Sequence, residues 1–82
     1  MPSIPVLYFA ALRDCLACER DVVDLPTETT AEAVLTALAR RHPQAAELFA
    51  RSRLAVDLGF AKGAIQLSER SEVAVIPPVS GG

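Results

Sequence analysis

The last two residues, Gly81 and Gly82, have the clearest chemical use in this sequence. They follow an apolar run and the pair Pro77-Pro78. Glycine has no Cβ, so a Gly-Gly end can enter a channel that is too narrow for side chains and bring the terminal carboxylate to a distant reaction centre. Extended backbone over residues 79–82 would span about 13 Å. Most chain ends are simply frayed, so this interpretation needs support from the rest of the sequence.

Two cysteines form a second candidate site, a C-x-x-C at Cys15 and Cys18. A structural zinc site needs four ligands, and the single histidine, His42, does not complete a convincing set. No strand–helix–strand pattern indicates a redox-active pair. We therefore expect two reduced thiols in a helical turn that behave as small apolar residues, with no metal site and no stably bound cofactor.

The remaining polar residues do not form a catalytic pattern. His42 directly precedes Pro43 at a predicted helix end, where a histidine suits capping or dipole compensation better than catalysis. A nucleophile paired with this histidine stays open, although no nucleophile motif accompanies it. The carboxylates, Asp21 among them, are spread over turns and element ends, which is typical of a solvated surface. Gly59 and Gly63 are interpreted as turn residues rather than a phosphate-binding loop.

Size and charge limit the partners. Eighty-two residues are expected to form one domain, residues 1–82, because nothing in the middle resembles a linker. The net charge of −2 argues against nucleic acid, because phosphate binding needs clustered Lys and Arg. The longest apolar run, Ile4 to Leu12, is much shorter than the roughly 20 residues of a membrane-spanning helix, and no signal peptide precedes it. We expect a cytoplasmic protein that binds neither nucleic acid nor membranes.

Strands around one long helix would have to position these residues. Strands are predicted over residues 4–10, 20–25, 54–58 and 72–76, with a further short extended piece over residues 64–67. The first two strands pair antiparallel and are joined by a short helix over residues 11–17. The last strand is apolar throughout, so we place it in the middle of the sheet with both faces covered.

The main helix is predicted from its start signal and its periodicity. Thr29 and Glu32 have the spacing of a capping box. Apolar residues then recur at helical spacing and form one buried stripe of Ala31, Val34, Leu35 and Leu38. Pro43 ends the helix, and residues 44–51 add one or two further turns. The order ββαββ indicates an α+β fold in which this helix covers one face of the sheet.

Four segments carry a resemblance to a known family. They are Val6-Leu7-Tyr8-Phe9-Ala10-Ala11-Leu12-Arg13, Asp24-Leu25-Pro26, Arg41-His42-Pro43 and Glu72-Val73-Ala74-Val75-Ile76-Pro77-Pro78-Val79-Ser80-Gly81-Gly82. With these segments the chain resembles, over nearly its whole length, the MoaD-type small subunits of molybdopterin synthase. Those subunits are sulfur carriers of the ubiquitin-like β-grasp fold. The chain departs from the family at Asp57, where asparagine is common, so the resemblance implies no role for that loop.

The resemblance implies a β-grasp domain with a mixed sheet, a flexible tail at residues 79–82 and no catalytic site of its own. The chain would be the non-catalytic sulfur-donor subunit of a heterotetrameric sulfurtransferase. A terminal carboxylate is ionised and unreactive at neutral pH, so a ubiquitin-activating-like, MoeB-like adenylyltransferase would adenylate Gly82 with ATP. A persulfide sulfur donor would then leave a thiocarboxylate on Gly82.

The same resemblance implies how the sulfur is delivered. The large, MoaE-like synthase subunit would take the tail into its active site, with Ser80 and Gly81 threading the channel. There the sulfur would pass to a cyclic pterin precursor in molybdenum cofactor biosynthesis. The family's apolar contact positions imply partner binding by Phe9, Phe60, Ile76, Pro77, Pro78 and Val79. Any of the first three could instead belong to the core, and Phe60 is expected to be the most exposed because it follows Gly59 in a turn.

Two alternatives stay open at this stage. Related β-grasp carriers also end in Gly-Gly, so the chain could be a thiazole-type, ThiS-like carrier or serve another sulfur-containing product. The context Pro77-Pro78-Val79-Ser80 before the glycines favours molybdopterin. The other alternative is a non-catalytic β-grasp interaction module whose tail is incidental.

Overall fold

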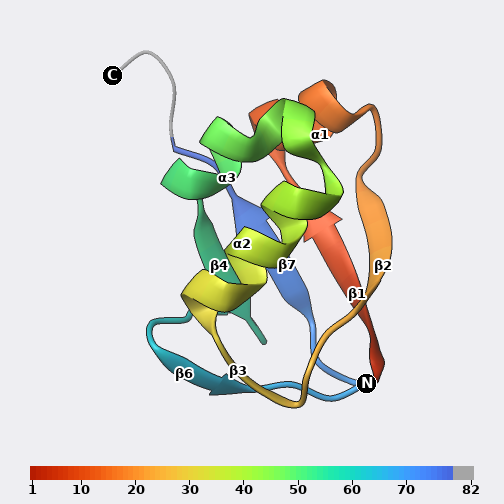
Figure 1. The fold of residues 1–82 in the computed structure, drawn as a ribbon, viewed down its shortest axis with the longest axis vertical. Coiled ribbons are helices and arrows are strands. Elements are labelled where there is room, and N and C mark those ends of the chain that lie inside the picture. Colours follow the sequence, from red (N-terminus) through yellow and green to blue (C-terminus); the bar gives the residue numbers. More distant parts are fainter. Residues whose placement is uncertain (79–82) are drawn as a thin grey trace.

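A mixed β-sheet forms the centre of the molecule (Figure 1). The computed structural model describes residues 1–78, and the predicted tail at residues 79–82 lies outside the described residues. The strands of this sheet are β1 (Ser3–Tyr8), β2 (Arg20–Asp24), β4 (Arg53–Val56), β5 (Gly59–Phe60) and β7 (Val73–Ile76). Within residues 1–78 their order is β2-β1-β7-β4-β5. β1 and β7 are parallel, and the other neighbouring strands are antiparallel.

Helices cover one face of the sheet. Figure 1 shows α2 (Ala31–Arg41) lying across that face, with α1 (Ala10–Leu16) and α3 (Ala46–Arg51) near the end of the sheet where β7 finishes. A short 3-10 turn (Pro43–Ala45) joins α2 to α3. This arrangement is the ubiquitin-like β-grasp fold, which confirms the predicted α+β class and the main helix. No helix in the part of the chain that the structure describes has the length and apolar character needed to cross a membrane.

Side-chain alternation along the strands places the core between the sheet and the helices. Ile4, Val6 and Tyr8 of β1 point toward the helices and are almost completely buried. Val34 and Leu38 of α2 meet them from the other side. The same cluster includes Leu12, Val23, Leu25, Ala31, Ala45, Phe49, Leu54, Leu67, Val73 and Val75. Full burial of a large aliphatic or aromatic side chain contributes about 1.5–3 kcal/mol, so this cluster provides the main stabilisation of the fold.

The central strand β7 is covered on one face only. It lies between β1 and β4, as predicted. Val73 and Val75 are buried, whereas Ala74 and Ile76 on the opposite face are only half-buried. The prediction that both faces of this strand are covered is therefore wrong, because the helices pack on one side of the sheet. An apolar surface is left open on the other side.

The start of α2 differs from the predicted capping box. Thr30, not Thr29, is the N-cap, and its Oγ1 accepts a hydrogen bond of 3.0 Å from the backbone N–H of Ala33. Ala33 therefore occupies the position where a capping box needs a glutamate. Glu32 stands one position earlier, in the first turn, where its charge interacts favourably with the helix dipole. The predicted buried stripe is confirmed except at Leu35, which is half-buried.

Short strands account for the remaining differences. β6 (Ala64–Gln66) confirms the extended piece predicted over residues 64–67, and it pairs with β3 (Glu28–Thr30) in a separate two-stranded sheet. β3 and β5 have no counterpart in the prediction, because two or three residues are too few to show a periodicity. The predicted strand over residues 54–58 is wrong at its end, since β4 stops at Val56 and a turn follows.

Candidate functional site

The face of the sheet that the helices leave open carries a row of apolar residues. Leu7 of β1 is opposite Ala74 of β7, Ala74 is opposite Ala55 of β4, and Ala55 is opposite Phe60 of β5. Residues that are opposite one another on neighbouring strands have side chains in direct reach. Ile76 lies two residues after Ala74 in β7, and it pairs with Arg53 of β4. Strand register thus assembles one continuous surface from four strands.

An apolar groove of about 240 Å³ lies on this face. The three apolar positions proposed from the resemblance, Phe9, Phe60 and Ile76, all line it. The side chains of Phe9 and Phe60 are 43% and 62% exposed, and Ile76 is half-buried. None of the three belongs to the core cluster, so the alternative that they are simply core residues is wrong. Phe60 is the most exposed of them, as predicted, although it lies in β5 rather than in the turn.

The β4–β5 turn adds Leu58 to the groove, a residue that the sequence analysis missed. Asp57 and Leu58 have φ values of 50° and 72°, and positive φ at both central residues is the pattern of a type I′ hairpin turn. Leu58 lines the groove and is 94% exposed. The two-residue spacing between the strands was the available signal, but Asp-Leu is an unusual sequence for a turn that favours glycine in its second position.

Asp57, the departure from the family pattern, has a structural role. Its Oδ1 accepts a hydrogen bond of 2.9 Å from the backbone N–H of Glu72, and its own N–H donates to the Glu72 carbonyl at 2.9 Å. Aspartate and asparagine both tolerate positive φ. Both also present a side-chain oxygen that can accept this bond. The substitution therefore keeps the turn attached to the start of β7.

A second groove of about 430 Å³ lies where β7 ends and the chain leads into residues 79–82, and we call it the tail-exit groove. Its lining residues are Arg51, Arg53, Phe60, Ile76, Pro77 and Pro78. Pro77 is buried and Pro78 is exposed. Proline fixes φ near −65°, so this pair stiffens the backbone just before the tail. The predicted tail residues Val79, Ser80, Gly81 and Gly82 lie outside the part of the chain that the structure describes.

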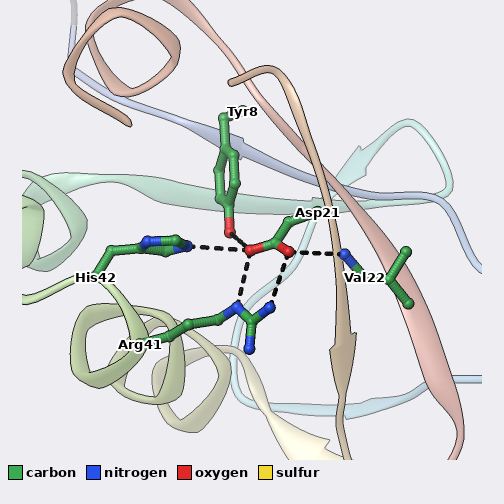
Figure 2. Close-up of polar contacts among 5 residues, drawn as sticks. All are labelled: Tyr8, Asp21, Val22, Arg41 and His42. Carbon is green, nitrogen blue, oxygen red and sulfur yellow. Dashed lines mark hydrogen bonds and ion pairs between the residues drawn. The ribbon is translucent and has the colours of Figure 1, made fainter. Parts of the chain in front are cut away.

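A cluster around Asp21 lies on the helical side of the sheet (Figure 2). Oδ2 accepts hydrogen bonds from the Tyr8 hydroxyl at 3.0 Å and from Arg41 Nε at 2.9 Å. Oδ1 accepts from Arg41 Nη2 at 3.1 Å and from the Val22 backbone N–H at 2.9 Å. Nε2 of His42 lies 3.0 Å from Oδ2. The carboxylate thus ties β1, β2 and the C-terminal end of α2 together.

Electrostatics in this cluster favour an ionised aspartate. Burial by itself would raise the pKa of Asp21, but the hydrogen bonds from Arg41, His42 and Tyr8 outweigh it and hold that pKa well below its usual range. The same ion pair raises the pKa of Arg41. Burial, followed by the hydrogen bond to Asp21, raises the pKa of Tyr8. Both carboxylate oxygens already accept hydrogen bonds within the fold, so we interpret the cluster as structural. We call this hydrogen-bonded cluster around Asp21 the clasp.

This cluster corrects the interpretation of Asp21 and adds a contact to that of His42. Asp21 is not a solvated surface carboxylate, because its side chain is only 16% exposed. His42 does stand at the end of α2, where its backbone N–H donates to the Leu38 carbonyl at 2.9 Å. Its imidazole, however, faces Asp21 and stacks near Phe49. Sequence reasoning missed the cluster because its members are far apart along the chain.

The cysteines lie away from both grooves. Cys15 is exposed in α1, Cys18 is half-buried, and both are free thiols. Among residues 1–78, no group of three His, Cys, Asp or Glu side chains is close enough to hold a metal ion. The open sheet face and the tail-exit groove are the candidate functional surfaces of the described chain.

Comparisons with known proteins agree on one family. The ThiS family profile matches residues 6–82. A relative from Caenorhabditis briggsae named molybdopterin synthase sulfur carrier subunit is 31% identical over 84 residues, covering 100% of both chains. A relative of the same name from Mycobacterium tuberculosis is 31% identical over 83 residues, again covering 100% of both. Among solved structures, SAMP1 from Haloferax volcanii is similar with a TM-score of 0.78 and 24% identity, covering 98% of this chain and 99% of that one, which shows the shared fold.

Proposed function

This chain belongs to the ThiS family, and from that premise we propose that it is the sulfur-carrier subunit of a molybdopterin synthase. The observation that carries the proposal is the end-to-end match to curated relatives of that name from a nematode and a bacterium. The open apolar face and the tail-exit groove support it, because a carrier needs a surface for its partner beside the segment that it delivers.

In this proposal the working group is the terminal carboxylate of Gly82. The carboxylate attacks the α-phosphate of ATP on a separate activating enzyme, pyrophosphate leaves, and an acyl adenylate forms. The outer sulfur of a persulfide donor then attacks the acyl carbon and displaces AMP, which gives an acyl disulfide. A second thiol attacks the donor's sulfur, so that a thiocarboxylate remains on Gly82 and the donor and the second thiol end as a disulfide. The chain contributes no acid, base or metal to these steps, which are proposed to take place in the cytoplasm.

The large synthase subunit would dock on the open sheet face and receive the tail. Phe9, Phe60 and Ile76 are the proposed anchors, since they share one groove with exposed apolar surface. A standard interface buries about 800 Å² per partner and depends on a few large side chains at its centre. Pro77 and Pro78 would direct the tail, while Val79, Ser80 and Gly81 would thread the channel that leads to the pterin precursor.

Intact-mass spectrometry tests the carrier chemistry. The chain is incubated with an activating enzyme, ATP, a persulfide donor and a reducing thiol, and its mass should rise by the difference between one sulfur and one oxygen. A variant that lacks Gly82 is the control, and it should fold like the wild type without gaining sulfur. A plain interaction module would show no mass change in either protein, and that result would contradict the proposal.

The acceptor separates molybdopterin from thiazole synthesis. The sulfurated chain is mixed with the large synthase subunit and the cyclic pterin precursor, and separately with a thiazole-forming enzyme and its substrates. We expect sulfur loss and a dithiolene product only in the first mixture. Turnover only in the second would assign the chain to the thiazole-type alternative, which the ThiS family match also accommodates.

A further inference from the structure

Two arginines flank the tail-exit groove. Arg51 ends α3 and Arg53 begins β4, and both residues line the groove. The guanidinium carbon of Arg53 lies 5.2 Å from the centre of the Phe60 ring. The other lining residues are Phe60, Ile76, Pro77 and Pro78. The groove therefore combines an apolar lining with two cationic residues.

Neither of these two cations is neutralised by a paired carboxylate within the described chain. Within residues 1–78, neither Arg51 nor Arg53 forms an ion pair, and no Asp or Glu lines the groove. Arg41 provides the contrast, since its guanidinium makes two hydrogen bonds to Asp21. The whole chain has a net charge of −2. The rim of the tail-exit groove thus has the opposite sign to the molecule as a whole.

The contact with Phe60 holds the Arg53 guanidinium in a position from which it can bind an anion. A guanidinium near an aromatic ring gains a cation–π attraction that restricts its side chain. The planar group keeps its N–H donors at the edge, where a carboxylate can accept two parallel hydrogen bonds. Phe60 also lines the apolar groove on the open sheet face, so the cation sits directly beside the proposed docking anchors.

We propose that Arg53, supported by Arg51, is a partner-recognition residue, and that the large synthase subunit presents carboxylates at the mouth of the channel that receives the tail. The inference rests on the proposed function and adds the chemistry of the partner surface to it. Rim charges of opposite sign steer association and fix the orientation of docking more than they add affinity. The pair of arginines would therefore align the tail with the channel as the complex forms.

Charge reversal with a matched control tests this inference. Arg53→Glu places a negative charge on the rim, and Arg70→Glu makes the same change in the turn before β7, at the opposite end of that strand from the tail. Association of each full-length chain with the large synthase subunit from the same genome is measured at low and high salt. We expect Arg53→Glu to slow association by about tenfold at low salt. Added salt should shrink that loss, and Arg70→Glu should stay within about twofold of the wild type.

Other results would overturn the inference. Equal effects of the two reversals would mean that only net charge matters, and a loss that salt does not change would indicate lost packing against Phe60. If Arg53→Glu bound the large subunit normally but was no longer adenylated, the arginine would belong to the surface for the activating enzyme. A variant Arg53→Lys should retain most of the association rate, and unchanged melting temperatures would show that all variants are folded.

The wild-type control distinguishes this inference from the proposed function. If the wild-type chain binds the large subunit and Arg53→Glu binds equally well, only the role of Arg53 is wrong. If the wild-type chain itself fails to bind the large subunit, the proposed function fails and the inference fails with it.

Discussion

Leu58 combines two unfavourable features in one residue. Its φ of 72° lies in the left-handed region, where a side chain with a Cβ costs about 1–2 kcal/mol. Its apolar side chain is also 94% exposed. Strained or exposed residues of this kind often mark functional surfaces. Since Leu58 lines the apolar groove, we interpret it as a docking residue kept at the expense of stability.

Leu58→Gly should therefore stabilise the fold and weaken partner binding. Removal of the strained Cβ, offset in part by the greater freedom of glycine in the unfolded chain, should raise the free energy of unfolding by about 0.5–1 kcal/mol. Loss of the apolar contact should weaken binding to the large synthase subunit by about tenfold. Urea denaturation and a binding titration measure the two effects.

Ala17→Gly is the matched control for that experiment. Ala17 follows α1 with a φ of 56° and lines neither groove. Replacing it with glycine should therefore raise the free energy of unfolding by a similar amount. Its affinity for the large subunit should not change. If Leu58→Gly bound as well as Ala17→Gly, Leu58 would be a strained residue without a role in docking.

The clasp around Asp21 should make stability depend on pH in the acid range. Because the folded pKa is lowered, ionised Asp21 stabilises the fold above its unfolded pKa of about 3.9. That contribution is lost as the pH falls through the folded pKa. Asp21→Asn should cost about 2–3 kcal/mol at pH 7, and the difference from the wild type should shrink below about pH 4.

Denaturation curves from pH 7 to the acid limit of folding measure this difference. Asp24→Asn is the control, since Asp24 is exposed at the end of the same strand and its Oδ1 accepts a hydrogen bond of 2.8 Å from the Ser3 hydroxyl. It should cost less than about 0.5 kcal/mol. A constant difference between wild type and Asp21→Asn at all pH values would show that the charge of Asp21 is not what stabilises the clasp.

Among the elements, α2 shows how a single side chain sets a helix start. Thr29 and Thr30 are equivalent in a sequence pattern, but only Thr30 Oγ1 reaches a free N–H of the first turn. Both threonines belong to β3, where Thr29 pairs with Ile65 of β6 and Thr30, the last residue of the strand, pairs with Ala64. The point at which β3 ends therefore decides which threonine caps the helix.

Thr30→Ala should cost about 1 kcal/mol, because the N–H of Ala33 loses its partner. Thr29→Ala should cost less than half of that value, since it removes no cap. Urea denaturation of both variants measures the difference. If both variants lowered the free energy of unfolding equally, the capping box between Thr29 and Glu32 would again be the better explanation of the helix start.

The whole molecule separates its apolar residues into two surfaces. Phe49 is completely buried among the helices and Tyr8, whereas Phe60 is 62% exposed on the open face of the sheet. One surface holds the fold together and the other is available for a partner. The helices pack on one side of the sheet, and this decides that Phe49 is buried and Phe60 is exposed.

Phe60→Asp and Phe49→Leu should have opposite profiles. Phe60→Asp should leave the melting temperature nearly unchanged and weaken binding to the large subunit by at least about tenfold, because it places a charge in the apolar docking surface. Phe49→Leu should lower the free energy of unfolding by about 1 kcal/mol or more and leave affinity unchanged. A large loss of stability in Phe60→Asp with normal binding would place Phe60 in the core.

Local signals were sufficient for much of this fold. The helical period over Ala31 to Leu38, the break at Pro43 and the apolar last strand depend on neighbouring residues, so each could be recognised before the structure was known. The same holds for the family, because its blocks near both ends of the chain are continuous in sequence. The two-residue β5 and the three-residue β3 could not be predicted, because such strands form only against a partner strand.

Sequence alone was sufficient to predict the fold class and the family and to propose a reactive end of the chain, since periodicity, turn signals and contiguous motifs are local properties. Tertiary structure decided that Asp21 is clasped by Tyr8 and Arg41, and that Leu58 and Phe60 share a groove with Ile76. It also decided which apolar residues remain exposed. These outcomes depend on which distant segments meet and on which face of the sheet the helices cover, and no residue's own type carries that information.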